Sequence, residues 1–156
     1  PSDRIIYAVS ELADFSLLWH LVGWSKALAG SDDDLEAAVR LSVLLGIESV
    51  VVNAGIKSLF KRERPVYQGV RPHNLRVPLT TSFPSGHASA AVVSAILLSD
   101  RSREAPLYWG LAGFVAASRI HVRIHHASDV IGGAVVGAGV GLALRKIWPH
   151  PRRRRG

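Results

Sequence analysis

Residues 118–148 read SRIHVRIHHASDVIGGAVVGAGVGLALRKIW, a polar cluster followed by a glycine-rich apolar segment. Gly133, Gly137 and Gly141 recur at four-residue spacing, which places them on one face of a helix. Each glycine in a soluble helix would cost about 1 kcal/mol relative to alanine, so three in a row argue for a packing role. Helices in lipid use small residues in this way to bring their backbones close together. We therefore predict a closely packed, lipid-embedded helix over 128–148.

The remainder of the chain also favours helices, because long β-branched alternation is missing from it. Apolar residues make up 48% of the 156 residues, and the absence of cysteine excludes disulfides and thiolate chemistry. The longest polar stretch, 61–83, contains Pro72 and Pro78, which would break a helix. We predict further helices over residues 5–15, 15–29, 35–60, 85–99 and 106–125.

Hydropathy alone leaves two environments open for these helices. The uncharged runs 105–118 and 130–144 are shorter than the roughly 18 residues of a membrane span, so a buried soluble bundle stays an alternative. The charges that shorten these runs lie mostly in three polar blocks, at residues 57–65, 84–87 and 118–129. A site at the bilayer surface would explain these charges. We predict an all-α, multi-pass transmembrane helix bundle in one domain over 1–156. It would have about five spans, or four spans and an interfacial helix.

The charge distribution predicts an orientation. The formal net charge is +7, and its local source is the basic tail over 149–156, which contains Arg152–Arg155. Basic segments beside membrane helices favour the cytoplasmic side. We therefore place the tail in the cytoplasm and the polar blocks outside, with membrane lipids and not nucleic acid as the tail's partner.

The third polar block contains His125 and Asp129, which are four residues apart. On a helix they would share a face and form a hydrogen bond. A carboxylate that accepts from one ring nitrogen fixes the tautomer and leaves the other nitrogen as a more basic nucleophile. A helix-surface pair without function is the alternative for these two residues taken alone.

The second block is Pro84-Ser85-Gly86-His87. A helix that starts here directs free backbone N–H groups at an anion, Gly86 permits a close approach, and Ser85 adds a hydroxyl donor. His87 would then lie within a turn of the anion and could protonate a leaving oxygen. A helix cap with an incidental histidine is the alternative for this tetrapeptide alone.

Three cationic residues, Lys57, Arg64 and Arg119, would neutralise a bound phosphate, with arginine offering a fork for two oxygens. We interpret Lys61 and Arg62 as side chains that extend to the membrane surface from a helix end. His121 and His125 are also four apart, which raises zinc as an alternative, but the sequence pattern offers no third convergent ligand outside Asp129 and His126. We expect no metal and no cofactor.

Together the three blocks resemble the signature of the type 2 phosphatidic acid phosphatase superfamily, which includes acid phosphatases and vanadium haloperoxidases. The blocks are Lys57-x6-Arg64-Pro65, Pro84-Ser85-Gly86-His87 and Ser118-Arg119-x5-His125-x3-Asp129. The resemblance implies that His125 forms a phosphohistidine, that Asp129 orients it, and that His87 protonates the departing alcohol. It also implies which residues hold the phosphoryl oxygens: Lys57, Arg64, Ser85, Gly86 and Arg119.

The resemblance further implies a membrane enzyme that hydrolyses a phosphomonoester or pyrophosphate of a polyprenyl or glycerol lipid, without a metal. Family members typically have six spans, so the role of residues 1–30 in this shorter chain stays open. A soluble acid phosphatase or vanadium haloperoxidase is one alternative. A membrane protein that binds anionic lipids without catalysis is the other.

Overall fold

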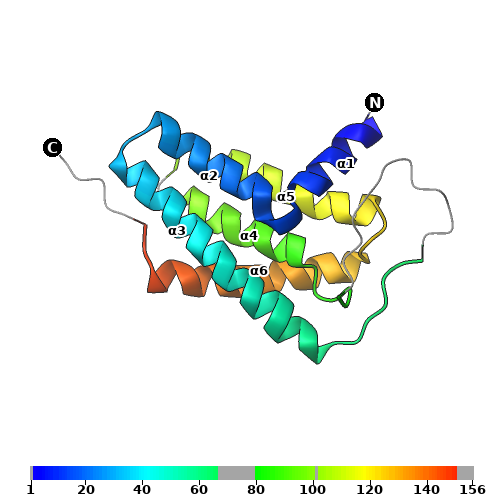
Figure 1. The fold of residues 1–156 in the computed structure, drawn as a ribbon. Coiled ribbons are helices and arrows are strands. Elements are labelled where there is room, and N and C mark those ends of the chain that lie inside the picture. The colour runs from blue at the N-terminus through cyan, green and yellow to red at the C-terminus, as the bar shows by residue number, and fades with distance from the viewer. Residues whose placement is uncertain (1, 67–79, 101, 151–156) are drawn as a thin grey trace.

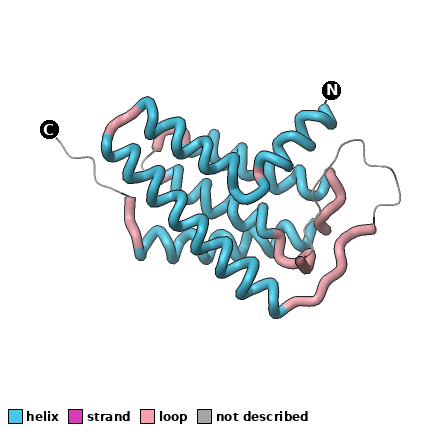
Figure 2. Tube along the Cα trace, viewed as in Figure 1, coloured by secondary structure: helices cyan, strands magenta, loops and turns pink. Residues whose placement is uncertain are grey.

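A computed structural model describes residues 2–66, 80–100 and 102–150. Within these residues it contains helices and no strands (Figures 1 and 2). The elements are α1 (Ser2–Leu12), the 3-10 turn η1 (Asp14–Ser16), α2 (Leu17–Ala29), α3 (Asp32–Ser49), the π-helical η2 (Val50–Gly55), the 3-10 turn η3 (Ile56–Leu59), α4 (Gly86–Ser99), α5 (Ala105–His121) and α6 (Ala127–Ile147). The all-helical prediction is confirmed.

Helix α4 lies at the centre of the bundle and packs against α3, α5 and α6 (Figure 1). Its sequence explains this position, because Ala88, Ala91 and Ala95 are fully buried small residues that allow neighbours to approach from several sides. Larger side chains from the surrounding helices, such as Trp19 and Leu44, complete the core. The central helix therefore has its first turn enclosed by the other elements.

The glycine face of α6 packs on the backbone of α4. A methyl group built on Gly133 would lie 2.3 Å from the Ser85 carbonyl oxygen, and one on Gly137 would lie 2.5 Å from the Ser89 carbonyl oxygen. At Gly141 the nearest atom would be Ile96 Cδ1 at 2.9 Å. The structure thus confirms that this face serves close backbone approach.

Helix α3 begins at Asp32, within the segment 31–34 whose serine and three carboxylates indicate a helix start. Ser31 and Asp34 form a capping box there, in which the Ser31 N–H donates to Asp34 Oδ2 at 2.8 Å. The helical path continues through η2 and η3 to Leu59, as the predicted helix over 35–60 requires. This long path leads from the α2–α3 turn to the opposite end of the bundle (Figure 1). Its last element, η3, contains Lys57.

Among the described residues, α6 is the one helix that is long and apolar enough on its own to cross a membrane. Helices α1 and α2 would form a second span if they acted as one, although they are bent by 69° at the break between them. Helix α4 has 14 residues and is apolar but short. The number of spans stays a prediction. Residues Pro72, Pro78 and Arg152–Arg155 lie outside the described residues.

Candidate active site

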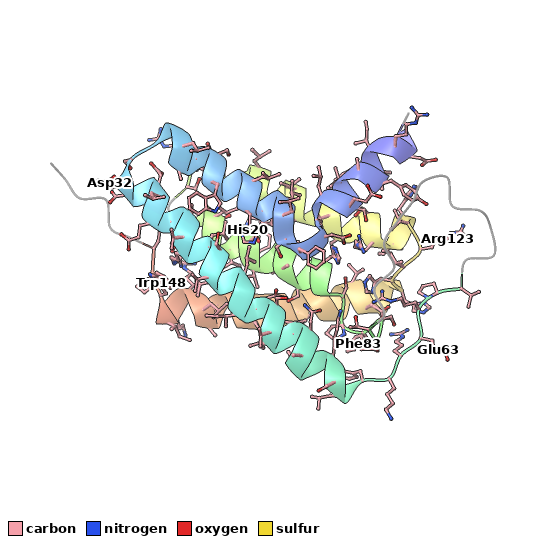
Figure 3. All side chains as sticks on the ribbon, viewed as in Figure 1. His20, Asp32, Glu63, Phe83, Arg123 and Trp148 are labelled. Atoms are coloured by element: carbon pink, nitrogen blue, oxygen red, sulfur yellow. The ribbon has the colours of Figure 1, made fainter. Side chains whose placement is uncertain are left out.

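The three polar blocks meet at one end of the bundle. Figure 3 places Glu63, Phe83 and Arg123 at this end, whereas Asp32 and Trp148 lie at the opposite end. The site end is formed by η3, the described residues 60–66 and 80–85, the first turn of α4 and the α5–α6 connection. Helix α4 leads away from this end and α5 returns to it, so the second and third blocks lie on the same side.

His125 lies in the α5–α6 connection and not on a helix. Helix α5 ends at His121, because Arg123 adopts a left-handed backbone with φ of 54° that a helix cannot continue through. The His125 N–H donates to the Arg119 carbonyl at 3.3 Å, and only 3% of the residue is exposed. The predicted helix over 106–125 is therefore four residues too long.

This loop also changes the relation between His125 and Asp129. Asp129 is in the first turn of α6, where its Oδ2 accepts the His126 N–H at 2.8 Å. The distance from His125 Nδ1 to Asp129 Oδ2 is 3.7 Å, and within the described residues this nitrogen has no hydrogen-bond partner. The expected hydrogen bond on a shared helix face is thus wrong for this structure. The contact becomes an ion pair only when the His125 ring is protonated or otherwise positively charged.

Arg62 was interpreted as a surface side chain, but it contacts the site. Its Nη1 lies 2.9 Å from Asp129 Oδ1 and donates to Ser128 Oγ at 2.9 Å. The Asp129 side chain is fully buried, so Arg62 compensates a charge that has lost its water. The only sequence signal was its position between Lys57 and Arg64, inside the block itself.

Arg64 joins the first block to the third. Its Nη1 lies 3.3 Å from His125 Nε2 and donates to the Ile124 carbonyl at 2.9 Å, while its Nη2 donates to the Thr80 carbonyl at 3.1 Å. A guanidinium is only a donor, so Nε2 must carry the lone pair and Nδ1 the proton of the neutral ring. That is the tautomer in which Nε2 can act as a nucleophile.

The surroundings of His125 lower its pKa to about 2. Burial is the largest cause, followed by the positive charges of Arg64 and Arg119. The expectation that Asp129 makes the free ring nitrogen more basic stays a prediction, since burial and the surrounding cations set the net direction of this pKa shift. The ring is therefore neutral throughout the physiological pH range, and its Nε2 lone pair accepts from Arg64 Nη1.

The second block forms the start of α4 as predicted. Ser85 is the N-cap, and its Oγ accepts the Ala88 N–H at 3.4 Å. A methyl group on Gly86 would lie 2.9 Å from Asn53 Oδ1 and 3.5 Å from Lys57 Nζ, so a side chain here would collide with its neighbours. Lys57 is 6% exposed. The first turn of α4 therefore lies directly against the Lys57 ammonium group.

The N-terminal segment supplies two contacts that the sequence reasoning missed. His87 Nε2 lies 2.7 Å from Asp14 Oδ1, and Arg119 Nη1 donates to the Ser10 carbonyl at 3.0 Å and to the Ser10 hydroxyl. Arg119 is fully buried. The role of residues 1–30, which the resemblance left open, thus includes contact with two predicted site residues. A carboxylate that interrupts the apolar run of residues 12–19 was the available signal.

His121 does not join the cluster. Its Nε2 lies 3.1 Å from Asp3 Oδ1 in an exposed pair, and the end of α5 separates it from His125. In the part of the chain that the structure describes, no group of three or more His, Asp or Glu side chains could hold a metal ion. The shared helix face that raised zinc as an alternative is therefore wrong.

Comparison with known proteins identifies relatives of this arrangement. The PAP2 superfamily matches residues 37–153. A decaprenylphosphoryl-5-phosphoribose phosphatase from Mycobacterium tuberculosis is 35% identical over 140 residues, which cover 87% of this chain and 77% of that protein. A putative undecaprenyl-diphosphatase, YbjG of Escherichia coli, is 26% identical and covers 92% of this chain and 71% of its own length.

Two solved structures share the fold. The transmembrane PAP2 type phosphatidylglycerolphosphate phosphatase of Bacillus subtilis has a TM-score of 0.68 at 20% identity, over 98% of this chain and 79% of that one. LpxE of Aquifex aeolicus has a TM-score of 0.67 at 26% identity, over 92% of this chain and 85% of that one.

Proposed function

Because this chain belongs to the PAP2 superfamily, we propose that it is an integral-membrane lipid phosphate phosphatase that acts through a phosphohistidine. One observation carries the proposal: His125 Nε2 holds its lone pair among the cationic side chains of Arg64, Arg119 and Lys57. A phosphate dianion that enters this cluster loses its hydration water but gains contact with fixed positive charges. Its phosphorus atom then lies beside an unprotonated nitrogen.

In the first half of the proposed reaction, His125 Nε2 attacks phosphorus and the bond from phosphorus to the lipid oxygen breaks. Lys57, Arg64 and Arg119 stabilise the charge on the three remaining oxygens, together with Ser85 and the Gly86 N–H at the start of α4. Positive charge develops on the His125 ring, and Asp129 opposite Nδ1 stabilises it.

His87 completes this step as the general acid, because an alkoxide is a poor leaving group unless it gains a proton as it departs. In the second half, water attacks the phosphohistidine, His87 accepts the water proton, and the bond from phosphorus to Nε2 breaks. Inorganic phosphate leaves and both histidines return to their starting states. Neither half requires a metal or a cofactor in this proposal.

The proposed membrane location rests on the outer surface of the bundle. Opposite its glycine face, α6 exposes Ile131 at 65%, Val135 at 68% and Leu142 at 51%. Such a row of large apolar side chains is unfavourable in water and suits contact with acyl chains. We propose a multi-pass protein with the site at the extracytoplasmic surface and the basic tail in the cytoplasm. The lipid headgroup would enter the site while its hydrocarbon stays in the bilayer.

For the substrate we propose a polyprenyl phosphate, and most specifically decaprenylphosphoryl-5-phosphoribose. This is the compound in the name of the relative at 35% identity. That compound would connect the enzyme to cell-wall arabinan synthesis. Undecaprenyl pyrophosphate and phosphatidylglycerol phosphate are the competing lipids, since proteins with those names are also relatives or share the fold.

The test is phosphate release by the full chain in detergent, with EDTA present, for the wild type and His125→Ala. We expect EDTA-resistant release from a short-chain lipid phosphate by the wild type and none by the variant. Parallel assays with the three candidate lipids would then rank them by kcat/KM. Release that survives in His125→Ala would refute the phosphohistidine, and release that EDTA abolishes would require a metal.

A further inference from the structure

We propose that Asp14, in the N-terminal segment, is a positioning residue that orients His87 for its role in proton transfer. This inference rests on the proposed phosphatase function, in which His87 is the general acid. Asp14 Oδ1 lies 2.7 Å from His87 Nε2, and the two side chains are only 18% and 14% exposed. The pair joins residues that are 73 positions apart in the chain.

The backbone at Asp14 is strained in a way that serves this contact. Phe15 and Ser16 both adopt left-handed conformations, with φ of 53° and 59°. Residues other than glycine pay about 1–2 kcal/mol for this region, and two in succession are uncommon. The turn gains little from burial of its own aromatic ring, since Phe15 is 79% exposed. What the turn achieves is to bend α1 away from α2 by 69° and to direct Asp14 at His87.

The contact decides which ring nitrogen of His87 exchanges protons. A carboxylate oxygen accepts from Nε2–H, so Nε2 keeps its proton in both charge states of the ring. Nδ1 is then the atom that gives a proton to the departing lipid oxygen and later takes one from the attacking water. Without Asp14 the neutral ring can adopt the other tautomer, in which Nδ1 already carries a proton and cannot accept another.

Electrostatics gives Asp14 a second effect on the same atom. Burial is the main cause that disfavours the His87 imidazolium, and the cationic side chains of Arg119 and Lys57 add to it. The negative charge of Asp14 is the one that favours the imidazolium. A general acid must be protonated when substrate is bound, so Asp14 offsets the same cations that the phosphate needs.

The experiment compares two substrates whose leaving groups differ in their need for a proton. A short-chain alkyl phosphate needs general acid at its departing oxygen, whereas p-nitrophenolate leaves p-nitrophenyl phosphate unprotonated. We expect Asp14→Asn to lower kcat on the alkyl phosphate by about 10- to 100-fold, part of what general acid catalysis supplies. On p-nitrophenyl phosphate the rate of the first p-nitrophenolate release, measured before the phosphoenzyme turns over, should stay within about threefold of the wild type, because that step needs no proton from His87. Asp14→Glu should recover part of the alkyl activity.

Asp3→Asn is the matched control. Asp3 forms the same type of contact, to His121, from the same N-terminal segment, but the pair is exposed and outside the site. If the N-terminal segment acted only by docking on the bundle, Asp3→Asn and Asp14→Asn would have similar effects on both substrates. An equal loss on the two substrates in Asp14→Asn, or no loss on either, would overturn the proposal. A melting temperature in detergent within a few degrees of the wild type verifies that each variant is folded.

A second measurement separates this inference from the proposed function. In protein labelled with ¹⁵N-histidine, the ring shifts of His87, assigned by comparison with His87→Gln, report which nitrogen carries the proton. We expect Nε2–H in the wild type and a mixture of tautomers in Asp14→Asn. The same tautomer distribution in both proteins would overturn the role of Asp14, even for a chain that releases no phosphate. Absence of turnover with the expected shifts would instead refute the phosphatase proposal alone.

Discussion

Gly133→Ala tests whether the glycine face of α6 sets the position of the active site. The added methyl group would lie 2.3 Å from the Ser85 carbonyl oxygen, 3.1 Å from the Ser85 carbonyl carbon and 3.1 Å from the Ser85 nitrogen. Ordinary contact begins at 3.4 Å, so α6 and α4 would have to separate by about 1 Å at this point. The atoms in the way belong to the backbone, which cannot turn aside as a side chain does.

Two effects of opposite sign contribute to the expected stability change. Overpacking against rigid atoms destabilises by about 1–3 kcal/mol, and here the whole backbone of the α4 N-cap is involved. Replacing a helical glycine by alanine returns about 1 kcal/mol. Gly139→Ala isolates the second effect, since a methyl group on Gly139 would meet no atom within 4 Å. We expect Gly139→Ala to be stabilised by up to about 1 kcal/mol and Gly133→Ala to be destabilised by up to about 2 kcal/mol.

The assay is thermal unfolding in detergent together with phosphate release. The two variants differ by the overpacking effect of about 1–3 kcal/mol. For a chain of this length about 1 kcal/mol corresponds to roughly 2–4 °C in Tm, so their Tm values should differ by about 2–12 °C. Gly133→Ala should also lose about tenfold or more in kcat at temperatures where it is folded, because a shift near 1 Å misplaces Ser85 and the Gly86 N–H. Equal Tm values and equal activities for the two alanine variants would refute the close packing of α6 on the site.

Three further predictions concern the charged groups of the site. Arg64→Lys keeps the charge but loses the fork that reaches both His125 and the Thr80 carbonyl, so kcat/KM for a lipid phosphate should fall by about 10- to 100-fold; unchanged steady-state kinetics would contradict this. Arg62→Gln leaves the buried Asp129 charge without its ion-pair partner and should destabilise by about 1–2 kcal/mol, less than a fully buried pair because Arg62 is 41% exposed. Denaturant unfolding against the charge-matched Lys61→Gln measures that difference, and equal midpoints would rule it out. The pKa of His125 is lowered to about 2 in the folded protein and is about 6.5 when unfolded, so the unfolded chain binds a proton below pH 6.5 that the folded chain does not. Folded stability should therefore fall from pH 6.5 downward, by about 2 kcal/mol at pH 5, and His125→Gln should lack this component; identical Tm shifts between pH 7.5 and 5 in the two proteins would show that the ring titrates normally.

The sequence predicted the helices most reliably where local patterns were strong. The glycine spacing of 133, 137 and 141 correctly indicated a face for close packing, because a four-residue repeat fixes one side of a helix whatever its neighbour is. The start of α4 at Pro84-Ser85-Gly86 was equally readable from its N-cap residue. The predicted helix over 106–125 was too long because Arg123 has a left-handed backbone that ends α5 before His125. The sequence has no glycine, asparagine or other typical turn residue at Arg123 that would indicate this.

Long-range contacts were beyond the reach of sequence spacing. Asp14 and His87 meet only because α1 and α2 are bent across the first turn of α4, and this depends on tertiary packing. The same is true of Arg62 and Asp129, which belong to different blocks. Spacing could place His125 and Asp129 near each other, but the balance between one carboxylate and several cations around the ring required the three-dimensional arrangement.

The contact between Arg64 and His125 Nε2 has a consequence for how the resting protein behaves toward other reagents. A guanidinium that donates to the lone pair acts as a cap over the reactive nitrogen, so an electrophile or a metal ion meets a blocked atom. A ligand displaces the Arg64 guanidinium from Nε2 only if it offers that guanidinium better hydrogen-bond acceptors. The oxygens of a phosphoryl group are such acceptors. Under the proposed mechanism the phosphoryl group of the substrate therefore exposes the nitrogen that attacks it. The site recognises a phosphoryl group before His125 Nε2 becomes reactive.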